Sequence, residues 1–428
     1  MLIHLSKKVQ EREDFMSNFC QLAIQGGSKT ITKDFPARGH FGIEEKAAAL
    51  RLFDKSIASG EAFGYNGEEE ENFGKEFAAF LGGGYADGLN SGTNAVFVAL
   101  RALELPPFSE VVVSAVTDPG GIMPIVMNSC IPVIADCAPG KYNIGVKEVE
   151  AALTPLTSAI IVAHIGGEPA DIEGILKIAE ARHLPVIEDC AQSHGAKING
   201  RMVGTFGTYG AFSLMFGKHF CTGGQGGAVF CKTEDLYWRC RRAADRGKPF
   251  NLPEANGNVI CSLNCNLDEL GAAIGREQLK KLPGIIARRQ KFSAMLAETL
   301  KSLPSISIPA LLPGAEHSYW WWRLKVNHEQ ITCSKKEYCE ALVAEGVKMN
   351  ISYDAALPFL RDWFQNRPQK HPWNNPLYKG DSARSFPCPN ALTIMQECFN
   401  LTVFESWGEE EAGLVAKAFQ KVDRAFRK

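Results

Sequence analysis

The sequence predicts an α/β fold built on a mainly parallel sheet with helices on its faces. From about residue 86 to 230, short apolar runs alternate with helical stretches, an order that is typical of parallel sheets. Polar and glycine-rich residues follow the apolar runs where helices begin, which is where open α/β sheets bind ligands. The 428 residues are enough for a large core and for two domains.

Composition and charge argue against several classes of protein. A formal net charge of −2 disfavours nucleic acid or an anionic membrane as the main partner. The thirteen cysteines include no C-x-x-C pair, so we expect reduced, mostly buried thiols and no metal site. We find neither a secretory signal nor an apolar run of transmembrane length, and we expect a cytoplasmic protein.

The periodicity of apolar residues predicts three parts. These are an amino-terminal arm (residues 1–41, with a short helix over 15–24), a large α/β domain (42–285) and a smaller α+β domain (286–428). In the large domain we expect helices over 42–59, 68–81, 146–153, 172–182 and 234–244, and strands over 110–115, 131–135, 159–164, 184–187, 210–216 and 228–231. In the smaller domain we expect a long helix over 268–300, a tryptophan-rich strand over 318–326, a helix over 335–345, a loop region over 357–381 and a closing helix over 409–427.

A candidate phosphate site follows the first strand of the large domain. The strand ends in Ser91-Gly92-Thr93-Asn94, and a helix opens directly after it. Free N–H groups and the positive end of the helix dipole therefore meet at this turn, which suits a phosphate. The alternative is an ordinary helix N-cap in a βα turn.

An acidic residue and a lysine follow two later strands. The run 184–187 ends in Glu188-Asp189, and the run 210–216 ends near Lys218 and a cluster of four glycines. Pyridoxal phosphate (PLP) chemistry requires a lysine for the Schiff base, a carboxylate that keeps the pyridine nitrogen protonated, and small residues near the phosphate. Each residue alone has an ordinary explanation as a cap, a solvated charge or a turn, so only the combination favours PLP.

The same stretch resembles a known family. Glu188-Asp189-Cys190-Ala191-Gln192, then Ser213 with Lys218 five residues later, then Gly226-Gly227, is similar to the pattern of the DegT/StrS sugar aminotransferases. The turn Gly166-Gly167-Glu168-Pro169 matches a further family motif. The resemblance implies a PLP-dependent transferase of fold type I, with a seven-stranded sheet and a smaller carboxy-terminal domain.

The resemblance also implies a role for each matching residue. Lys218 would bind the cofactor covalently, Asp189 would hold the pyridine nitrogen protonated and Gln192 would bond the ring oxygen. The backbone of Gly92, Thr93 and Asn94, with Ser213, would hold the phosphate. Asn264 would reach the phosphate of a second subunit, so we expect a homodimer with shared active sites.

At two positions the sequence departs from the family pattern, so the family roles of these positions do not carry over. Asp118 stands where the family has an aromatic residue that stacks on the cofactor ring, and Asn266 replaces a basic residue. A dehydratase branch of the family has histidine in place of the lysine, and His219 adjoins Lys218. Counting five residues from Ser213 reaches Lys218, which favours the aminotransferase.

The expected function is transfer of an amino group from glutamate or glutamine to a keto-sugar, nucleotide-linked in most of the family, or to a cyclitol ketone. Such reactions supply amino sugars for polysaccharides or antibiotics. Two half-reactions at one site predict ping-pong kinetics. The alternatives are a sugar dehydratase of the same family and a non-catalytic PLP-binding regulator.

Overall fold

The computed structural model describes residues 21–428. The predicted helix over residues 15–24 falls mostly on residues 15–20, which lie outside the described part. The last two residues of the predicted range belong to a single 3₁₀ turn, η1 (Ala23–Gln25). The arm then leads to α2 (Ile43–Ser59), as the sequence predicts.

A seven-stranded sheet forms the centre of the molecule. Its strands in spatial order are β1 (Tyr85–Leu89), β9 (Gly227–Cys231), β8 (Tyr209–Ser213), β5 (Val186–Asp189), β4 (Thr157–Ala163), β2 (Glu110–Ser114) and β3 (Ile131–Ala135). Strand β9 runs antiparallel to both neighbours, and the other neighbouring pairs are parallel. This arrangement confirms the predicted α/β fold with a mainly parallel sheet.

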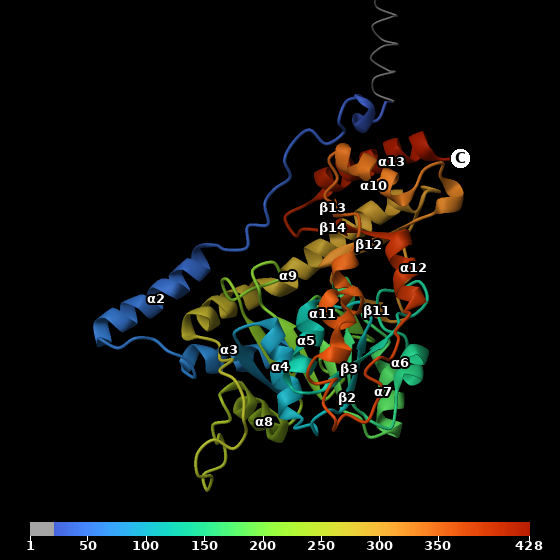
Figure 1. Ribbon diagram of the computed structural model, residues 1–428. Helices are drawn as coiled ribbons and strands as arrows, with labels where there is room; N and C mark the ends of the chain where they lie inside the picture. Colours follow the sequence, from blue (N-terminus) through green and yellow to red (C-terminus); the bar gives the residue numbers. More distant parts are fainter. Residues whose placement is uncertain (1–20) are drawn as a thin grey trace, which may run out of the picture.

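Helices cover both faces of the sheet (Figure 1). They are α3 (Glu68–Phe80), α4 (Gly92–Ala102), α5 (Pro119–Met127), α6 (Val146–Ala152), α7 (Ile172–Ala181) and α8 (Glu234–Ala244). The strands are buried on both faces, which explains their continuous apolar runs. On one face, Phe77 of α3 packs edge-on against Phe212 of β8 at 5.0 Å between ring centroids.

The carboxy-terminal part has its own sheet. The 32-residue helix α9 (Glu269–Leu300) runs from α3 towards α10 (Lys335–Ala344) and α13 (Glu409–Phe426) (Figure 1). The strands β10 (Ile306–Ser307), β12 (Trp321–Val326), β14 (Cys398–Thr402) and β13 (Met349–Asn350) pair antiparallel in that order. The predicted boundary between residues 285 and 286 lies inside α9, and the division into domains stays a prediction.

Some carboxy-terminal elements differ from the sequence prediction. The strand expected over 318–326 begins at Trp321, because Tyr319 takes a left-handed φ of 52°. The helix α12 (Pro389–Glu397) and the strands β13 and β14 were not predicted. The segment expected as a loop over 357–381 contains α11 (Asp362–Gln365) and the turns η5 (Pro358–Leu360) and η6 (Arg367–Gln369), and the turn η4 (Asp354–Ala356) directly precedes it.

A small third sheet joins the two parts of the chain. It consists of β11 (Ala315–Glu316), β6 (Lys197–Ile198) and β7 (Arg201–Met202), and the remaining turns are η2 (Ile165–Gly167) and η3 (His328–Gln330). The cysteines of the described residues are free thiols, most of them buried, as expected. Over residues 21–428, none of the helices combines the length and apolarity that a membrane crossing needs.

Candidate active site

A cavity of about 190 Å³ lies at the carboxyl edge of the central sheet. Its walls come from the ends of β5 and β8 and from the amino ends of α4 and α5. The lining residues are Ser91, Gly92, Thr93, Val96, Asp118, Gly120, Gly121, Asp189, Ala191, Ser213, Met215, Lys218 and Gln225. Residues from four separate elements therefore meet at one point, as expected for ligand sites of open α/β sheets.

The amino end of α4 forms one wall of the cavity. Ser91 caps the helix by accepting a hydrogen bond from the backbone N–H of Asn94 at 3.1 Å, which leaves the N–H groups of Gly92 and Thr93 without a helical partner. A Cβ on Gly92 would stand 2.5 Å from the Cβ of Ser213, so only glycine allows this approach. Thr93 and Ser213, which both carry hydroxyls, also line the cavity. Such a set of donors suits a phosphate.

Asn94 does not line the cavity. Its backbone N–H already has Ser91 as acceptor, and its side chain donates to Asn90 at 2.6 Å. The predicted contact of Asn94 with phosphate therefore stays a prediction, while Gly92 and Thr93 border the space directly.

Asp189 lies at the end of β5 on another wall. One carboxylate oxygen accepts from the N–H of Ala191 at 3.0 Å, and the other faces Gly121, where a Cβ would stand 2.7 Å from it. Burial raises the pKa of Asp189, and the nearby cation of Lys218 opposes that rise. A buried carboxylate with one oxygen free of intramolecular partners in the described chain can pair with a cationic ring nitrogen.

Lys218 enters the cavity from the loop after β8. Its side chain is buried, and Nζ lies 4.0 Å from the centroid of the Trp320 ring. Burial lowers the pKa of Lys218 to about 8, although the carboxylates of Asp189 and Asp118 raise it. A lysine of this pKa has a sizeable neutral fraction near neutral pH and can act as a nucleophile.

His219 points away from the cavity although it follows Lys218 directly. Its ring is fully buried, and Nε2 lies 3.0 Å from the carbonyl oxygen of Ser318. The ring also packs against His194, with 5.4 Å between centroids. Lys218 therefore lines the cavity, and His219 does not.

Gln192 does not line the cavity but follows Ala191, which does, and it is held at both ends of its side-chain amide. Oε1 accepts from the N–H of Gly166 at 2.8 Å, and Nε2 donates to the hydroxyl of Tyr353 at 2.9 Å. Tyr353 comes from the carboxy-terminal part of the chain. The sequence assigned no role to it, because no local pattern marks it.

Asn264 is exposed and does not line the cavity of its own chain. Its side-chain oxygen accepts from the amide nitrogen of Asn266 at 2.9 Å. Asp118 caps α5 by accepting from the N–H of Gly120 at 2.9 Å, so the position of the family's stacking aromatic holds a carboxylate here. An aromatic ring does lie beside Lys218, but it belongs to Trp320, in the predicted tryptophan-rich segment 318–326.

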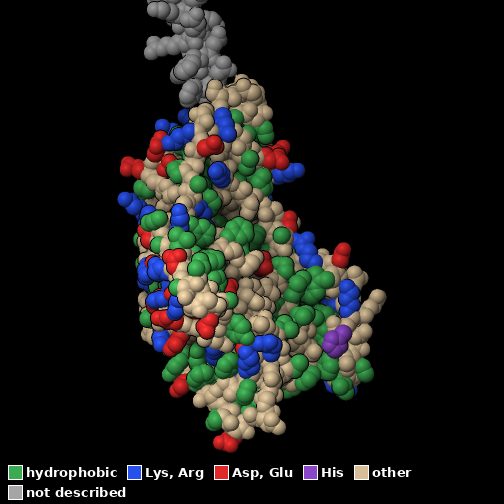
Figure 2. All heavy atoms as spheres, turned by 90° about the vertical axis from the view of Figure 1, so that its left-hand side faces the viewer, with side chains coloured by type: hydrophobic (Ala, Val, Ile, Leu, Met, Phe, Trp, Pro, Cys, Tyr) green, Lys and Arg blue, Asp and Glu red, His purple; other side chains and the backbone are tan. Residues whose placement is uncertain are grey.

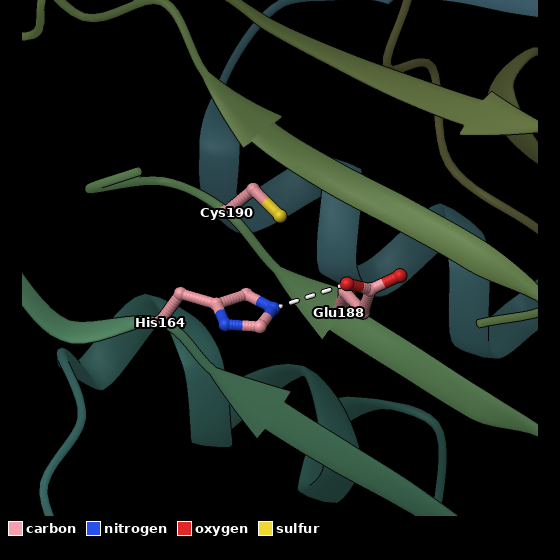
Figure 3. Close-up of side chains that lie close together, drawn as sticks. All are labelled: His164, Glu188 and Cys190. Carbon is pink, nitrogen blue, oxygen red and sulfur yellow. Dashed lines mark hydrogen bonds and ion pairs between the residues drawn. The ribbon is translucent and has the colours of Figure 1, made fainter. Parts of the chain in front are cut away.

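A buried group of His164, Glu188 and Cys190 has the composition of a metal site (Figure 3). The Nδ1 atom of His164 accepts from the N–H of Ala170 at 2.9 Å, so Nε2 of the neutral ring carries the proton and donates to Glu188 at 3.1 Å. The Glu188 carboxylate accepts three further hydrogen bonds from backbone N–H groups of residues 204, 206 and 207. With these lone pairs in use, the group is a structural hydrogen-bond network.

The residues around the cavity fit PLP. The free N–H groups of α4 and two hydroxyls match its phosphate, Asp189 matches its ring nitrogen, and Lys218 matches its aldehyde. Glycines at positions 92 and 121 leave space that any side chain would fill.

The sequence profile of the DegT/DnrJ/EryC1/StrS aminotransferase family matches residues 44–420. The chain is 30% identical over 347 residues to the UDP-N-acetyl-3-dehydro-alpha-D-glucosamine 3-aminotransferase of Acidithiobacillus ferrooxidans, covering 81% of this chain and 86% of that one. It is 31% identical over 326 residues to the L-glutamine:2-deoxy-scyllo-inosose aminotransferase of Micromonospora echinospora, covering 72% and 76%.

Solved structures of aminotransferases also resemble this chain. An aminotransferase from Psychrobacter cryohalolentis superposes with a TM-score of 0.80 at 26% identity, covering 92% of this chain and 99% of that one. DesV of Streptomyces venezuelae, solved in complex with a ketimine intermediate, superposes with a TM-score of 0.75 at 27% identity, covering 89% and 94%.

Proposed function

Because this chain belongs to the DegT/DnrJ/EryC1/StrS aminotransferase family, we propose that it moves an amino group from glutamate or glutamine to the ketone of a nucleotide-linked sugar or a cyclitol. The chain is a PLP-dependent aminotransferase that acts on a keto sugar. The observation that carries the proposed site is that Lys218 and Asp189 share one cavity with the amino end of α4.

Bound PLP supplies an aldehyde that takes up the amino group and a ring that accepts electrons from the bond being broken. Asp189 would hold a proton on the ring nitrogen. Gln192 would donate to the ring oxygen, and Gly92, Thr93, Asn94 and Ser213 would bind the phosphate.

Lys218 would first hold the cofactor and then move protons. Its pKa of about 8 lets the free amine both accept and release a proton near neutral pH. The apolar ring of Trp320 beside Nζ limits access of water to the amine. One site serving two half-reactions gives ping-pong kinetics.

The proposal includes a homodimer in which Asn264 reaches the phosphate of the second subunit. The exposed position of Asn264 is consistent with such a role. The helix α2 supports it further, since Ile43, Leu50 and Ile57 lie seven residues apart on one stripe and are 69%, 49% and 78% exposed. Figure 2 looks onto this side of the molecule and shows apolar side chains gathered among charged ones. We propose that a second copy of the chain covers this stripe, in a cytoplasmic enzyme.

The dehydratase alternative is disfavoured by the direction of His219, which bonds Ser318 inside the protein. The regulator alternative is disfavoured because Lys218 has a lowered pKa in a cavity it shares with an acid, as a reactive amine requires.

An absorbance spectrum tests the proposal. The purified protein with added PLP should show a visible band that bleaches on addition of L-glutamate or L-glutamine, and Lys218→Ala should lack it. Keto-sugar and cyclitol acceptors should then restore the band. A wild-type protein without the band, or a band in Lys218→Ala, would refute the assignment of Lys218.

A further inference from the structure

Tyr353 is the contact between the carboxy-terminal part of the chain and the side chain of Gln192. We propose that Tyr353 is a positioning residue for amino transfer, whose hydroxyl fixes the Gln192 amide so that its second N–H faces the cofactor. This inference rests on the proposed role of Gln192 at the PLP ring oxygen.

The orientation of the amide follows from its partners. The backbone N–H of Gly166 can only donate, so the atom of Gln192 that it meets at 2.8 Å must be the oxygen. The nitrogen therefore faces Tyr353 and donates one N–H to its hydroxyl at 2.9 Å. Residues 21–428 offer no acceptor for the other N–H of Nε2, which is therefore open to a ligand. Loss of the Tyr353 hydroxyl would remove the acceptor that fixes this direction.

Tyr353 is itself firmly placed. Its ring packs edge-on against Trp321 at 5.2 Å between centroids and lies 6.0 Å from the ring of Tyr142. Its carbonyl oxygen accepts from the N–H of Ala356 at 2.9 Å, and the carbonyl oxygen of Ala356 accepts from the N–H of Thr117 at 2.9 Å. The segment after β13 is thus bonded to the residue that precedes Asp118 in the cavity wall.

The hydroxyl keeps its proton over the neutral range. Burial raises the pKa of Tyr353, and the carboxylates of Asp118 and Asp189 raise it further, although the hydrogen bond from Gln192 opposes this. A protonated Tyr353 hydroxyl can accept a hydrogen bond from Gln192 and still donate its own proton to a ligand group near Asp118 and Asp189. The carboxy-terminal segment in this way sets the geometry of the cofactor pocket.

The structure offers a matched pair of variants. Tyr353→Phe removes the hydroxyl that accepts from Gln192 and keeps the ring. Tyr142→Phe removes a buried hydroxyl of the same aromatic cluster for which the described residues provide no hydrogen-bond partner. Both variants should fold, so a difference between them reports the Gln192 contact.

Three quantities should be measured on each variant: the dissociation constant of PLP, the pH midpoint of the visible band of lysine-bound PLP, and kcat for amino transfer. For Tyr353→Phe we expect PLP affinity to fall about fivefold and kcat about tenfold, the range for loss of one neutral hydrogen bond. The pH midpoint of the visible band should move to higher pH. Without the Tyr353 hydroxyl the Gln192 amide is less well oriented and stabilises the ionised ring oxygen of PLP less. Tyr142→Phe should leave all three unchanged.

A double variant separates this inference from the proposed function. If Tyr353 acts through Gln192, Tyr353→Phe should have no additional effect in a Gln192→Ala background. Additive effects, or a Tyr353→Phe protein with unchanged affinity, midpoint and kcat, would overturn the inference. If Gln192→Ala alone changes nothing, the proposed role of Gln192 fails. If Tyr353→Phe does not fold, 3-fluorotyrosine can replace Tyr353, because it keeps the ring and makes the hydroxyl a weaker acceptor. This substitution must then also move the pH midpoint of the visible band to higher pH.

Discussion

The guanidinium of Arg38 lies 2.9 Å from the main-chain carbonyl oxygen of Lys218. The same side chain donates to the carbonyl of Gly217 at 3.2 Å and to Glu405 at 3.0 Å. Arg289 of α9 bonds the second oxygen of Glu405 at 2.9 Å. The amino-terminal segment, α9 and the carboxy-terminal part therefore together hold the loop that carries the lysine.

Arg38→Ala should impair catalysis and stability together. The lysine loop would lose three hydrogen bonds, to the carbonyl oxygens of residues 217, 218 and 219, and Glu405 would lose a buried partner. Together these losses cost about 2–4 kcal/mol of unfolding free energy. We expect kcat to fall at least tenfold, measured beside urea unfolding. Arg239→Ala is the control, since its partner Asp235 is 69% exposed at the surface of α8. That variant should change stability by less than about 1 kcal/mol. If Arg38→Ala and Arg239→Ala had the same kcat and the same stability in urea, the proposed role of Arg38 would be contradicted.

The reaction of Lys218 with PLP should depend on pH around its lowered pKa. Burial lowers the pKa of Lys218 from 10.5 to about 8, so the rate at which the cofactor-free protein binds PLP covalently should rise with pH and reach half its maximum near pH 8. Asp118 raises this pKa, so Asp118→Asn should move the midpoint to lower pH. Asp235→Asn on the exposed face of α8 should leave it unchanged. A midpoint above 10 in the wild type would show that the amine is not desolvated.

Glu405 should make the fold sensitive to acid. Burial alone would raise its pKa, but the His40 ring, with Nε2 3.3 Å from the carboxylate, and the charges of Arg289 and Arg38 hold it well below its usual value of 4.5. The folded state then binds fewer protons than the unfolded state, so this contribution is fully present above pH 4.5 and is lost as the pH falls below it. Glu405→Gln should lose about 3 kcal/mol at pH 7. Its stability should also fall less than that of the wild type between pH 6 and pH 3 in urea unfolding followed by circular dichroism.

The parts of the site that are local in sequence could be predicted, and those that depend on tertiary packing could not. Asp189 and Ser213 are the last residues of their strands, and the turn at Gly92 comes shortly after β1, so their meeting at one sheet edge follows from the strand order. Tyr353 and Arg38 reach the site from segments more than 150 residues away in sequence, and no periodicity or motif marks them. The same reason explains the missed strand β14, whose five residues acquire a sheet only by pairing with β12 and β13.

Removal of metal ions should have no effect. The hydrogen-bonded state of His164 and Glu188 leaves no lone pairs arranged for an ion. Dialysis against a chelator should therefore change neither thermal stability nor the visible PLP band, and elemental analysis should find no stoichiometric zinc. By contrast, Glu188→Gln should destabilise the fold by about 3 kcal/mol, since an amide nitrogen would face backbone N–H donors. Loss of stability on chelation would instead support a metal at this group.

The apolar stripe of α2 should decide the oligomeric state. Leu50→Glu combined with Ile57→Glu places two charges where we propose that a second copy packs, so the variant should elute as a monomer in light-scattering chromatography. Because Asn264 would no longer reach a partner's phosphate, PLP affinity should fall about tenfold although both substitutions lie outside the cavity. Leu377→Glu is the control, since this side chain is 66% exposed in the carboxy-terminal part and should affect neither property. A monomeric variant with unchanged PLP affinity would remove Asn264 from the cofactor site, and a variant that remains dimeric would move the interface away from α2.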